Sequence, residues 1–161
     1  MKNMKPFLLV LSSILLLIFI PSCTNNSTST NNEEIETEFE STIRYENSGA
    51  QAYLVTNIDG GGAFAELDSA NPELTLTVGG RYTFINGAGA SSHPLDFRNE
   101  DGDKLIGQSN NSGLFDSNDE VNLLRDGDSI SFTLTEELAD EIADYICAFH
   151  PGMNGSIVIN E

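Results

Sequence analysis

From about residue 39 onwards, apolar and polar residues alternate over short runs that are separated by clusters of Gly, Asn and Asp. Successive side chains of a β-strand point to opposite faces, so each run of this kind predicts a strand with one buried face. Eight such strands are predicted, at residues 39–46, 52–56, 74–78, 81–86, 95–98, 129–134, 145–147 and 156–160. Short strands at this spacing, separated by turn residues, are typical of an all-β sandwich or barrel.

Two segments depart from this alternation. In residues 135–143, Leu138 and Ile142 are four positions apart and acidic residues surround them, which predicts a short amphipathic helix with a solvated acidic face. Thr135, followed by two glutamates, suits the start of that helix. Residues 99–122 are polar and acidic, and we expect a long loop there. Such a loop would either face a partner or be a disordered part of the surface.

The chain opens with the pattern of a secretory signal peptide, predicted for residues 1–22. Lys2 and Lys5 precede an apolar run at residues 7–20, which is too short for a membrane span. Cys23 follows directly, and this arrangement resembles a bacterial-type lipobox, in which the thiol is acylated and becomes the first mature residue. The alternative is ordinary cleavage nearby, with Cys23 removed along with the signal peptide.

Residues 24–32 contain no apolar side chain, so they cannot bury any surface and are predicted to be a flexible tether. We therefore expect a lipid-anchored linker at residues 23–38 and a single domain at residues 39–161. A linker of this length spans roughly 20 Å on average. This organisation predicts an exported lipoprotein in the periplasm or at the cell surface. It would act as a monomer and touch the membrane only through its N-terminal lipid.

The mature chain is strongly acidic. Without its signal peptide it carries five Lys and Arg against 25 Asp and Glu, a formal charge of −20. Such a charge repels nucleic acid and anionic lipid, and it steers the protein toward basic partners. A dense carboxylate surface is also typical of proteins from a salty medium, and the composition fits both interpretations. Nucleic-acid binding is excluded.

Residues with metal chemistry are concentrated near the C-terminus. Cys147, His150 and Met153 lie within seven residues, and the other histidine of the chain, His93, lies 54 positions before Cys147. Taken singly, these residues could be a buried inert thiol, a packed methionine and surface imidazoles. Together, two imidazoles, one thiolate and a thioether are the ligand set of a blue-copper electron-transfer site. If Cys23 is acylated, no intramolecular disulfide is possible, and a metal bond would protect the one remaining thiol.

The C-x-x-H-x-x-M spacing of Cys147, His150 and Met153 resembles the copper-binding loop of plastocyanin/amicyanin-type cupredoxins, in its short amicyanin-like form. Residues 79–86 resemble the strand that leads to the first histidine, residues 86–93 the loop that presents it, and residues 153–159 the closing strand. The resemblance implies a cupredoxin-like Greek-key β-sandwich of about eight strands, with the short helix before the copper loop. It further implies one type 1 copper ion bound by His93, Cys147, His150 and a weak axial Met153.

One position departs from the family pattern. Family members often carry Asn directly after the first histidine, where it helps to lock the ligand loops, whereas this chain has Pro94. The hydroxyl groups of Ser91 and Ser92 are candidates for replacing its hydrogen bonds. Next to His150, Phe149 and its neighbours are predicted to form a small apolar patch for docking a redox protein partner, while carboxylates elsewhere steer a basic docking surface toward it.

Three functions fit the sequence. The first is a membrane-tethered one-electron carrier of the blue copper class. The second is a copper-binding or copper-delivery protein without redox turnover, and the third is a copper-free cupredoxin-like accessory module. An enzymatic role is not expected, because two histidines and one thiol leave no residues for a second metal ion or a nucleophilic triad.

Overall fold

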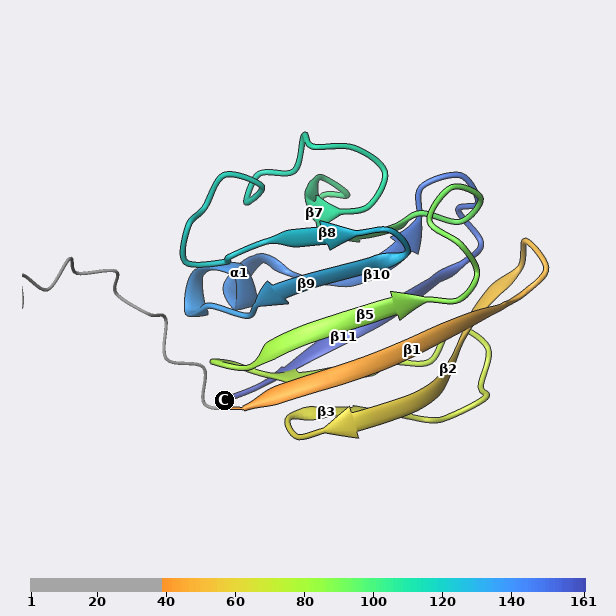
Figure 1. Ribbon diagram of the computed structural model, residues 1–161, viewed down its shortest axis with the longest axis horizontal. Coiled ribbons are helices and arrows are strands. Elements are labelled where there is room, and N and C mark those ends of the chain that lie inside the picture. The colour runs from red at the N-terminus through yellow and green to blue at the C-terminus, as the bar shows by residue number, and fades with distance from the viewer. Residues whose placement is uncertain (1–38) are drawn as a thin grey trace, which may run out of the picture. The chain divides into compact units, whose positions relative to one another are not determined.

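The computed structural model describes residues 39–161, which form eleven strands and one short helix. The strands make two sheets that pack face to face as a β-sandwich (Figure 1). The predicted signal peptide, the lipidation site Cys23 and the whole of the predicted linker lie outside the described residues. Within residues 39–161, no helix has the length and apolar character needed to cross a membrane.

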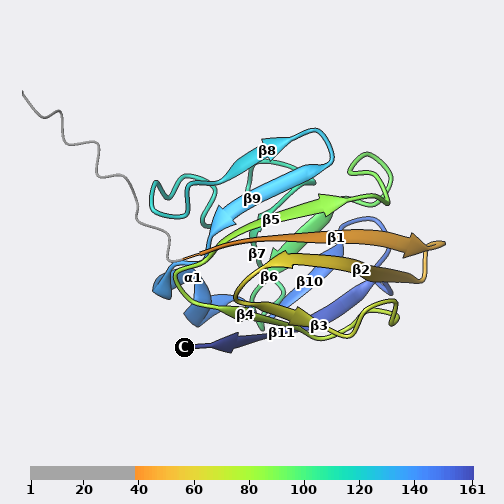
Figure 2. The same cartoon turned by 60° about the horizontal axis from the view of Figure 1, so that its bottom comes forward.

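The first sheet has five strands in the order β2-β1-β5-β9-β8, which can be followed side by side in Figure 2. Its strands are β2 (Ala52–Gly60), β1 (Glu40–Ser48), β5 (Arg81–Asn86), β9 (Ser129–Thr133) and β8 (Leu124–Asp126). β1 and β5 pair in parallel and all other neighbours are antiparallel. The sheet is therefore mixed.

The second sheet has six strands in the order β3-β4-β11-β10-β6-β7. Its strands are β3 (Ala63–Ala65), β4 (Leu74–Thr77), β11 (Asn154–Asn160), β10 (Asp144–Cys147), β6 (Leu95–Arg98) and β7 (Lys104–Gly107). Here β4 and β11 form the parallel pair. The antiparallel pair of β10 and β6 lies in the middle of this sheet, and these two strands adjoin the loops that carry the predicted metal ligands.

Aromatic rings fill the space between the sheets. In β5, burial alternates, so that Tyr82, Phe84 and Asn86 all point inward. The ring of Phe84 stacks on Phe132 of β9, with centroids 5.4 Å apart, and meets Phe97 of β6 edge-on at 4.9 Å. Burying each such ring contributes about 1.5–3 kcal/mol. The inward polar side chain of Asn86 is the exception in this row, and it lies at the end of β5 that leads to His93.

All eight strands predicted from alternation are present, with ends that differ by a few residues. The three additional strands were missed for physical reasons. β3 and β8 have only three residues each, too few to show a period. β7 lies inside residues 99–122, and its residues Leu105, Ile106 and Gly107 are all buried, so it does not alternate. The interpretation of 99–122 as one loop is therefore wrong, since Phe115 and Val121 also join the core.

The predicted helix is present as α1 (Glu136–Glu141). The hydroxyl oxygen of Thr135 accepts a hydrogen bond from the backbone N–H of Leu138 at 3.2 Å, which caps the first turn. Leu138 and Ala139 are buried. Ile142 already has extended backbone, so the helix stops there and the chain enters β10.

Candidate metal centre

The register of the second sheet brings two loops together at one end of the sandwich. Cys147, the last residue of β10, lies opposite Leu95, the first residue of β6. His93 comes just before β6, so it lies next to Cys147 although the two are 54 positions apart in the chain. The backbone N–H of Ala148 donates to the carbonyl of Pro94 at 3.0 Å and ties the two loops directly.

The loop after Cys147 closes on itself through backbone hydrogen bonds. The N–H of Cys147 donates to the carbonyl of Met153 at 2.9 Å, and the N–H of Met153 donates to the carbonyl of His150 at 2.9 Å. The N–H of His150 donates in turn to the carbonyl of Cys147 at 3.3 Å. These bonds fold six peptide units into a compact turn, which returns the ring of His150 to the Cys147 sulfur.

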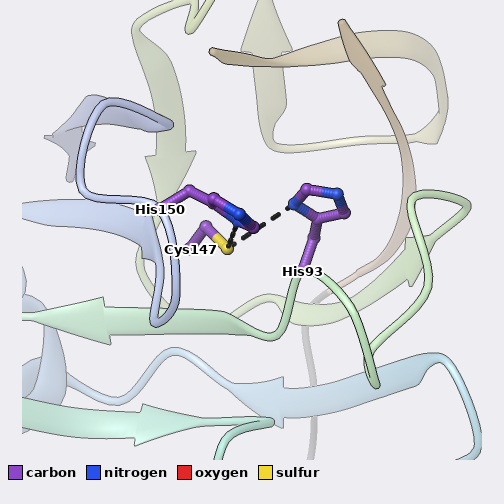
Figure 3. Close-up of side chains that lie close together, drawn as sticks. All are labelled: His93, Cys147 and His150. Atoms are coloured by element: carbon purple, nitrogen blue, oxygen red, sulfur yellow. Dashed lines mark hydrogen bonds between the residues drawn. The ribbon is translucent and has the colours of Figure 1, made fainter. Parts of the chain in front are cut away.

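His93, Cys147 and His150 form a cluster in which one potential ligand atom of each lies within 4.8 Å of the others. The Sγ atom of Cys147 is 3.8 Å from Nδ1 of His93 and 3.4 Å from Nδ1 of His150, as the dashed lines in Figure 3 mark. The two imidazole rings lie with centroids 4.6 Å apart. The sulfur is almost fully buried and both rings are partly buried. The structure therefore brings together three of the four predicted ligands.

These separations fit a single metal ion. Bonds to thiolate sulfur and imidazole nitrogen are about 2.3 and 2.0–2.1 Å long for a first-row ion such as zinc, so donors 120° apart around one ion are separated by about 3.7–3.8 Å. The observed 3.8 and 3.4 Å agree with this value within a few tenths of an ångström. Two imidazoles with one thiolate suit copper.

Met153, the fourth predicted ligand, is fully buried, and its backbone takes part in the loop described above. A soft thioether in this place has the chemistry of an axial copper ligand. Its role as that ligand stays a prediction.

The pKa of His93 is lowered from its ordinary value of 6.5 for two reasons. Burial disfavours the charged imidazolium, and the nearby His150 repels a second positive charge. At neutral pH His93 is therefore uncharged, the form in which a ring nitrogen can bind a metal ion.

Three polar residues that are not ligands, and that the sequence analysis missed, make hydrogen bonds to His93 or lie close to its ring. The carbonyl oxygen of His93 accepts hydrogen bonds from the hydroxyl of Tyr53 at 2.6 Å and from the amide of Asn86 at 2.7 Å. Nδ2 of Asn47 lies 3.5 Å from Nε2 of the His93 ring. Of the three, Asn86 could have been found from the sequence. It is a polar residue at an inward-facing position of β5, where apolar and polar residues alternate clearly.

The suggestion that Ser91 and Ser92 replace the missing hydrogen bonds of the family pattern is wrong. Both residues are exposed, and neither hydroxyl has a hydrogen-bond partner among residues 39–161. The two serines follow Gly89 and Ala90 in a tight turn, in which the N–H groups of Ser92 and His93 both donate to the carbonyl of Gly89. The inward hydrogen bonds to the loop come from β2 and β5 instead.

The two-sheet sandwich, with a His-Cys-His cluster at one end of its strands, is a cupredoxin-type fold. The donor set of the cluster makes it a candidate copper site. Among solved structures, that of a reduced rusticyanin is similar, with 16% sequence identity, 75% of this chain and 78% of that chain covered, and a TM-score of 0.36. No family model and no curated sequence matches the chain.

Proposed function

We propose that this protein is a one-electron carrier with a single type 1 copper ion. The observation that carries the proposal is the position of the Cys147 sulfur between the Nδ1 atoms of His93 and His150, at 3.8 and 3.4 Å. Two imidazoles and one thiolate, with the axial thioether of Met153, form the ligand set of blue-copper electron-transfer proteins. Bound copper would supply the change between cupric and cuprous states.

The residues of the chain would keep the structural rearrangement that accompanies this change small. Cys147 ends a strand in the middle of a sheet and His93 precedes its neighbour, so both are attached to rigid elements. The donors therefore keep their separation whichever charge the ion carries. The burial of Cys147 also keeps water away from its sulfur, which would be the strongest ligand. A classical enzymatic reaction would need an open position for a substrate, and we propose a carrier in place of a catalyst.

The surface around His150 supports docking of a redox partner. Phe149 is 61% exposed, and Ala148, Pro151 and Gly152 beside it are exposed and uncharged. The ring of His150 is partly exposed in the middle of these residues. On a protein of such high negative charge, an uncharged surface at the metal centre favours close contact with a partner. We propose that electrons leave and enter here, and that carboxylates elsewhere attract a partner with a basic docking surface.

We further propose that the carrier is exported and held at the outside of a membrane by a lipid on Cys23. Support for this part comes from the sequence alone, namely the apolar run at residues 7–20 and the cysteine that follows it. Mass spectrometry of the mature protein isolated from membranes tests it. An unmodified N-terminus other than residue 23 would contradict lipid anchoring.

Copper titration of the mature protein tests the central proposal. With cupric ion the wild type is expected to turn intensely blue, to give the paramagnetic resonance spectrum of a type 1 site, and to be reduced and reoxidised reversibly. Cys147→Ser keeps the shape of the side chain but lacks the thiolate, and it is expected to lose the blue band. Tight cuprous binding without a blue cupric form would contradict the carrier and favour copper delivery, and no copper binding would leave an accessory module.

A further inference from the structure

Tyr53, in β2, is linked to both of the loops that carry the candidate ligands, to one directly and to the other through Asn71. Its hydroxyl donates to the carbonyl of His93 at 2.6 Å. Its backbone N–H donates to the side-chain oxygen of Asn71 at 3.0 Å, and the side-chain nitrogen of Asn71 donates to the carbonyl of Gly152 at 3.0 Å. A continuous chain of hydrogen bonds therefore runs from the His93 loop to the loop of Cys147 and His150.

Asn86 adds a second buried link to the first loop. Its Nδ2 donates to the carbonyl of His93 at 2.7 Å and to the side-chain oxygen of Gln108 at 2.9 Å. The same oxygen of Gln108 accepts from the backbone N–H of Leu95 at 3.1 Å. Together with Tyr53, Asn86 occupies both lone pairs of the His93 carbonyl, so the backbone of this residue is held on two sides.

The polarity of Asn86 costs stability. Tyr53 and Asn86 are fully buried, and the side-chain oxygen of Asn86 has no hydrogen-bond partner among the described residues. An apolar side chain of similar size at position 86 would avoid that cost. Packing alone does not account for a buried amide with an unsatisfied oxygen, whereas a role in holding the backbone of His93 does.

Pro94 gives a reason why such links are needed. A proline has no backbone N–H, so the residue after His93 can offer no donor of its own to the neighbouring ligand loop. The backbone hydrogen bond between the loops runs the other way, from the N–H of Ala148 to the carbonyl of Pro94 at 3.0 Å. A further connection passes through Tyr53 and Asn71.

We propose that Tyr53, Asn71 and Asn86 act as a positioning frame that holds the two ligand loops at the separation a metal ion requires before the ion arrives. The role of the frame in metal binding rests on the proposed copper site, but the frame itself is a property of the metal-free protein. Residues outside the ligand set that orient it commonly account for a 10–100-fold difference in metal affinity. By fixing His93 and Cys147 in advance, the frame lowers the ordering that metal binding would otherwise require.

Hydrogen exchange of the metal-free protein tests the frame without copper. Tyr53→Phe removes only the hydroxyl, and Tyr82→Phe is a matched control, because Tyr82 is equally buried and its hydroxyl lies 2.8 Å from the carbonyl oxygens of Gly62 and Thr77, outside the ligand loops and the frame. Tyr53→Phe is expected to speed exchange of the His93 and Ala148 amides about tenfold or more beyond any change in distant core amides. Equal exchange at these two amides in both variants would overturn the proposal.

A second pair of variants tests the other half of the frame and covers the case in which Tyr53→Phe does not fold. Asn71 has a φ of 50°, which glycine adopts easily, so Asn71→Gly removes the side-chain hydrogen bonds without backbone strain. Asn122, with a φ of 47°, provides the matched control Asn122→Gly. Asn71→Gly is expected to speed exchange of the Met153 amide about tenfold or more. The proposal fails if the two variants behave alike there.

Measurements of copper affinity then test whether the frame contributes to metal binding. Wild type, Tyr53→Phe and Tyr82→Phe are titrated with copper against a competing chelator, and Tyr53→Phe is expected to bind at least about tenfold more weakly than Tyr82→Phe. If the wild type binds no copper, the proposed function fails, while the exchange data still decide the frame. If all three bind copper equally and their amides exchange equally, the frame fails and the carrier stands.

Discussion

At the scale of single residues, the balance between the two copper states would depend on the weakest ligand. Met153 offers a soft thioether, which favours the cuprous ion, and its burial keeps water from competing for the same position. A hard oxygen donor at this position would favour the cupric ion instead. The identity of residue 153 should therefore set the reduction potential more than it sets the fold.

Met153→Gln is expected to lower the reduction potential of the copper protein, because an amide oxygen stabilises the cupric state relative to a thioether. A tenfold change in the relative affinity for the two states corresponds to about 59 mV, and we expect a shift of at least that size. Protein-film voltammetry measures it, with Met153→Leu as the variant that keeps an apolar side chain. An unchanged potential in Met153→Gln would show that Met153 is not a ligand.

The four tyrosines of the chain give a second effect at this scale. All four are buried, and the pKa of each is raised above 10.0, mainly by burial. For Tyr82 it is raised to about 12. The unfolded chain therefore loses these protons at lower pH than the folded one does. Their contribution to stability is fully present below pH 10 and falls as the pH rises from about 10 through about 12.

For Tyr82 alone, this linkage amounts to about 2 kcal/mol of the free energy of unfolding between pH 10 and about 12. Denaturant unfolding at a series of alkaline pH values should show stability falling over that range, with tyrosinate absorbance appearing only as the protein unfolds. Tyr82→Phe should be less stable at neutral pH and should lose less stability on going alkaline. A flat stability profile above pH 10 would contradict the prediction.

At the scale of elements, alternation of apolar and polar residues predicts a strand wherever one face is buried and the other is solvated. β5 was predicted to the residue for this reason, and β6 was predicted to the residue because Asp96 keeps the alternation in its sequence although its side chain is buried. β7 could not be found this way, since Leu105 and Ile106 are adjacent apolar residues and both are buried. The spacing of Cys147, His150 and Met153 predicted one ligand loop, whereas the supporting contacts of Tyr53 and Asn71 depend on strand pairing between distant segments, which no local pattern carries.

Helix α1 gives a prediction for one element. Thr135→Ala removes the oxygen that caps the first turn through the N–H of Leu138, and it is expected to lower the free energy of unfolding by about 0.5–2 kcal/mol. Thr135→Ser retains an oxygen in the same place and should keep most of that stability. Chemical denaturation of the three proteins measures the difference. If serine is as destabilising as alanine, the hydrogen bond is not what stabilises the helix start.

At the scale of the whole molecule, charge is the dominant property. The formal charge of −20 on the predicted mature chain acts over distances that depend on salt, with a Debye length of about 30 Å at 0.01 M and about 8 Å at 0.15 M. A long-range field of this kind raises the encounter rate with cationic partners. The same charge opposes the compact state, so salt is also expected to stabilise the fold.

Electron transfer to a cationic redox complex should therefore slow as ionic strength rises over this range, by at least about tenfold, while transfer to a neutral complex of similar potential should change little. Stopped-flow kinetics of the copper protein measures both. Equal salt dependence for the two complexes would show that the acidic surface does not steer partners. A stability that rises steeply with salt alongside such kinetics would instead favour a saline habitat as the origin of the acidity.

The burial of Cys147, which is only 1% exposed, would matter during the interval between folding and the proposed uptake of a metal ion. A thiol that oxidants and other chains cannot reach has a long chemical lifetime, so the newly folded protein can wait for its ion without being lost to oxidation. The partly exposed rings of His93 and His150 would be within reach of an incoming ion before the buried sulfur is. In the proposed carrier, uptake of copper should therefore precede the appearance of the blue colour.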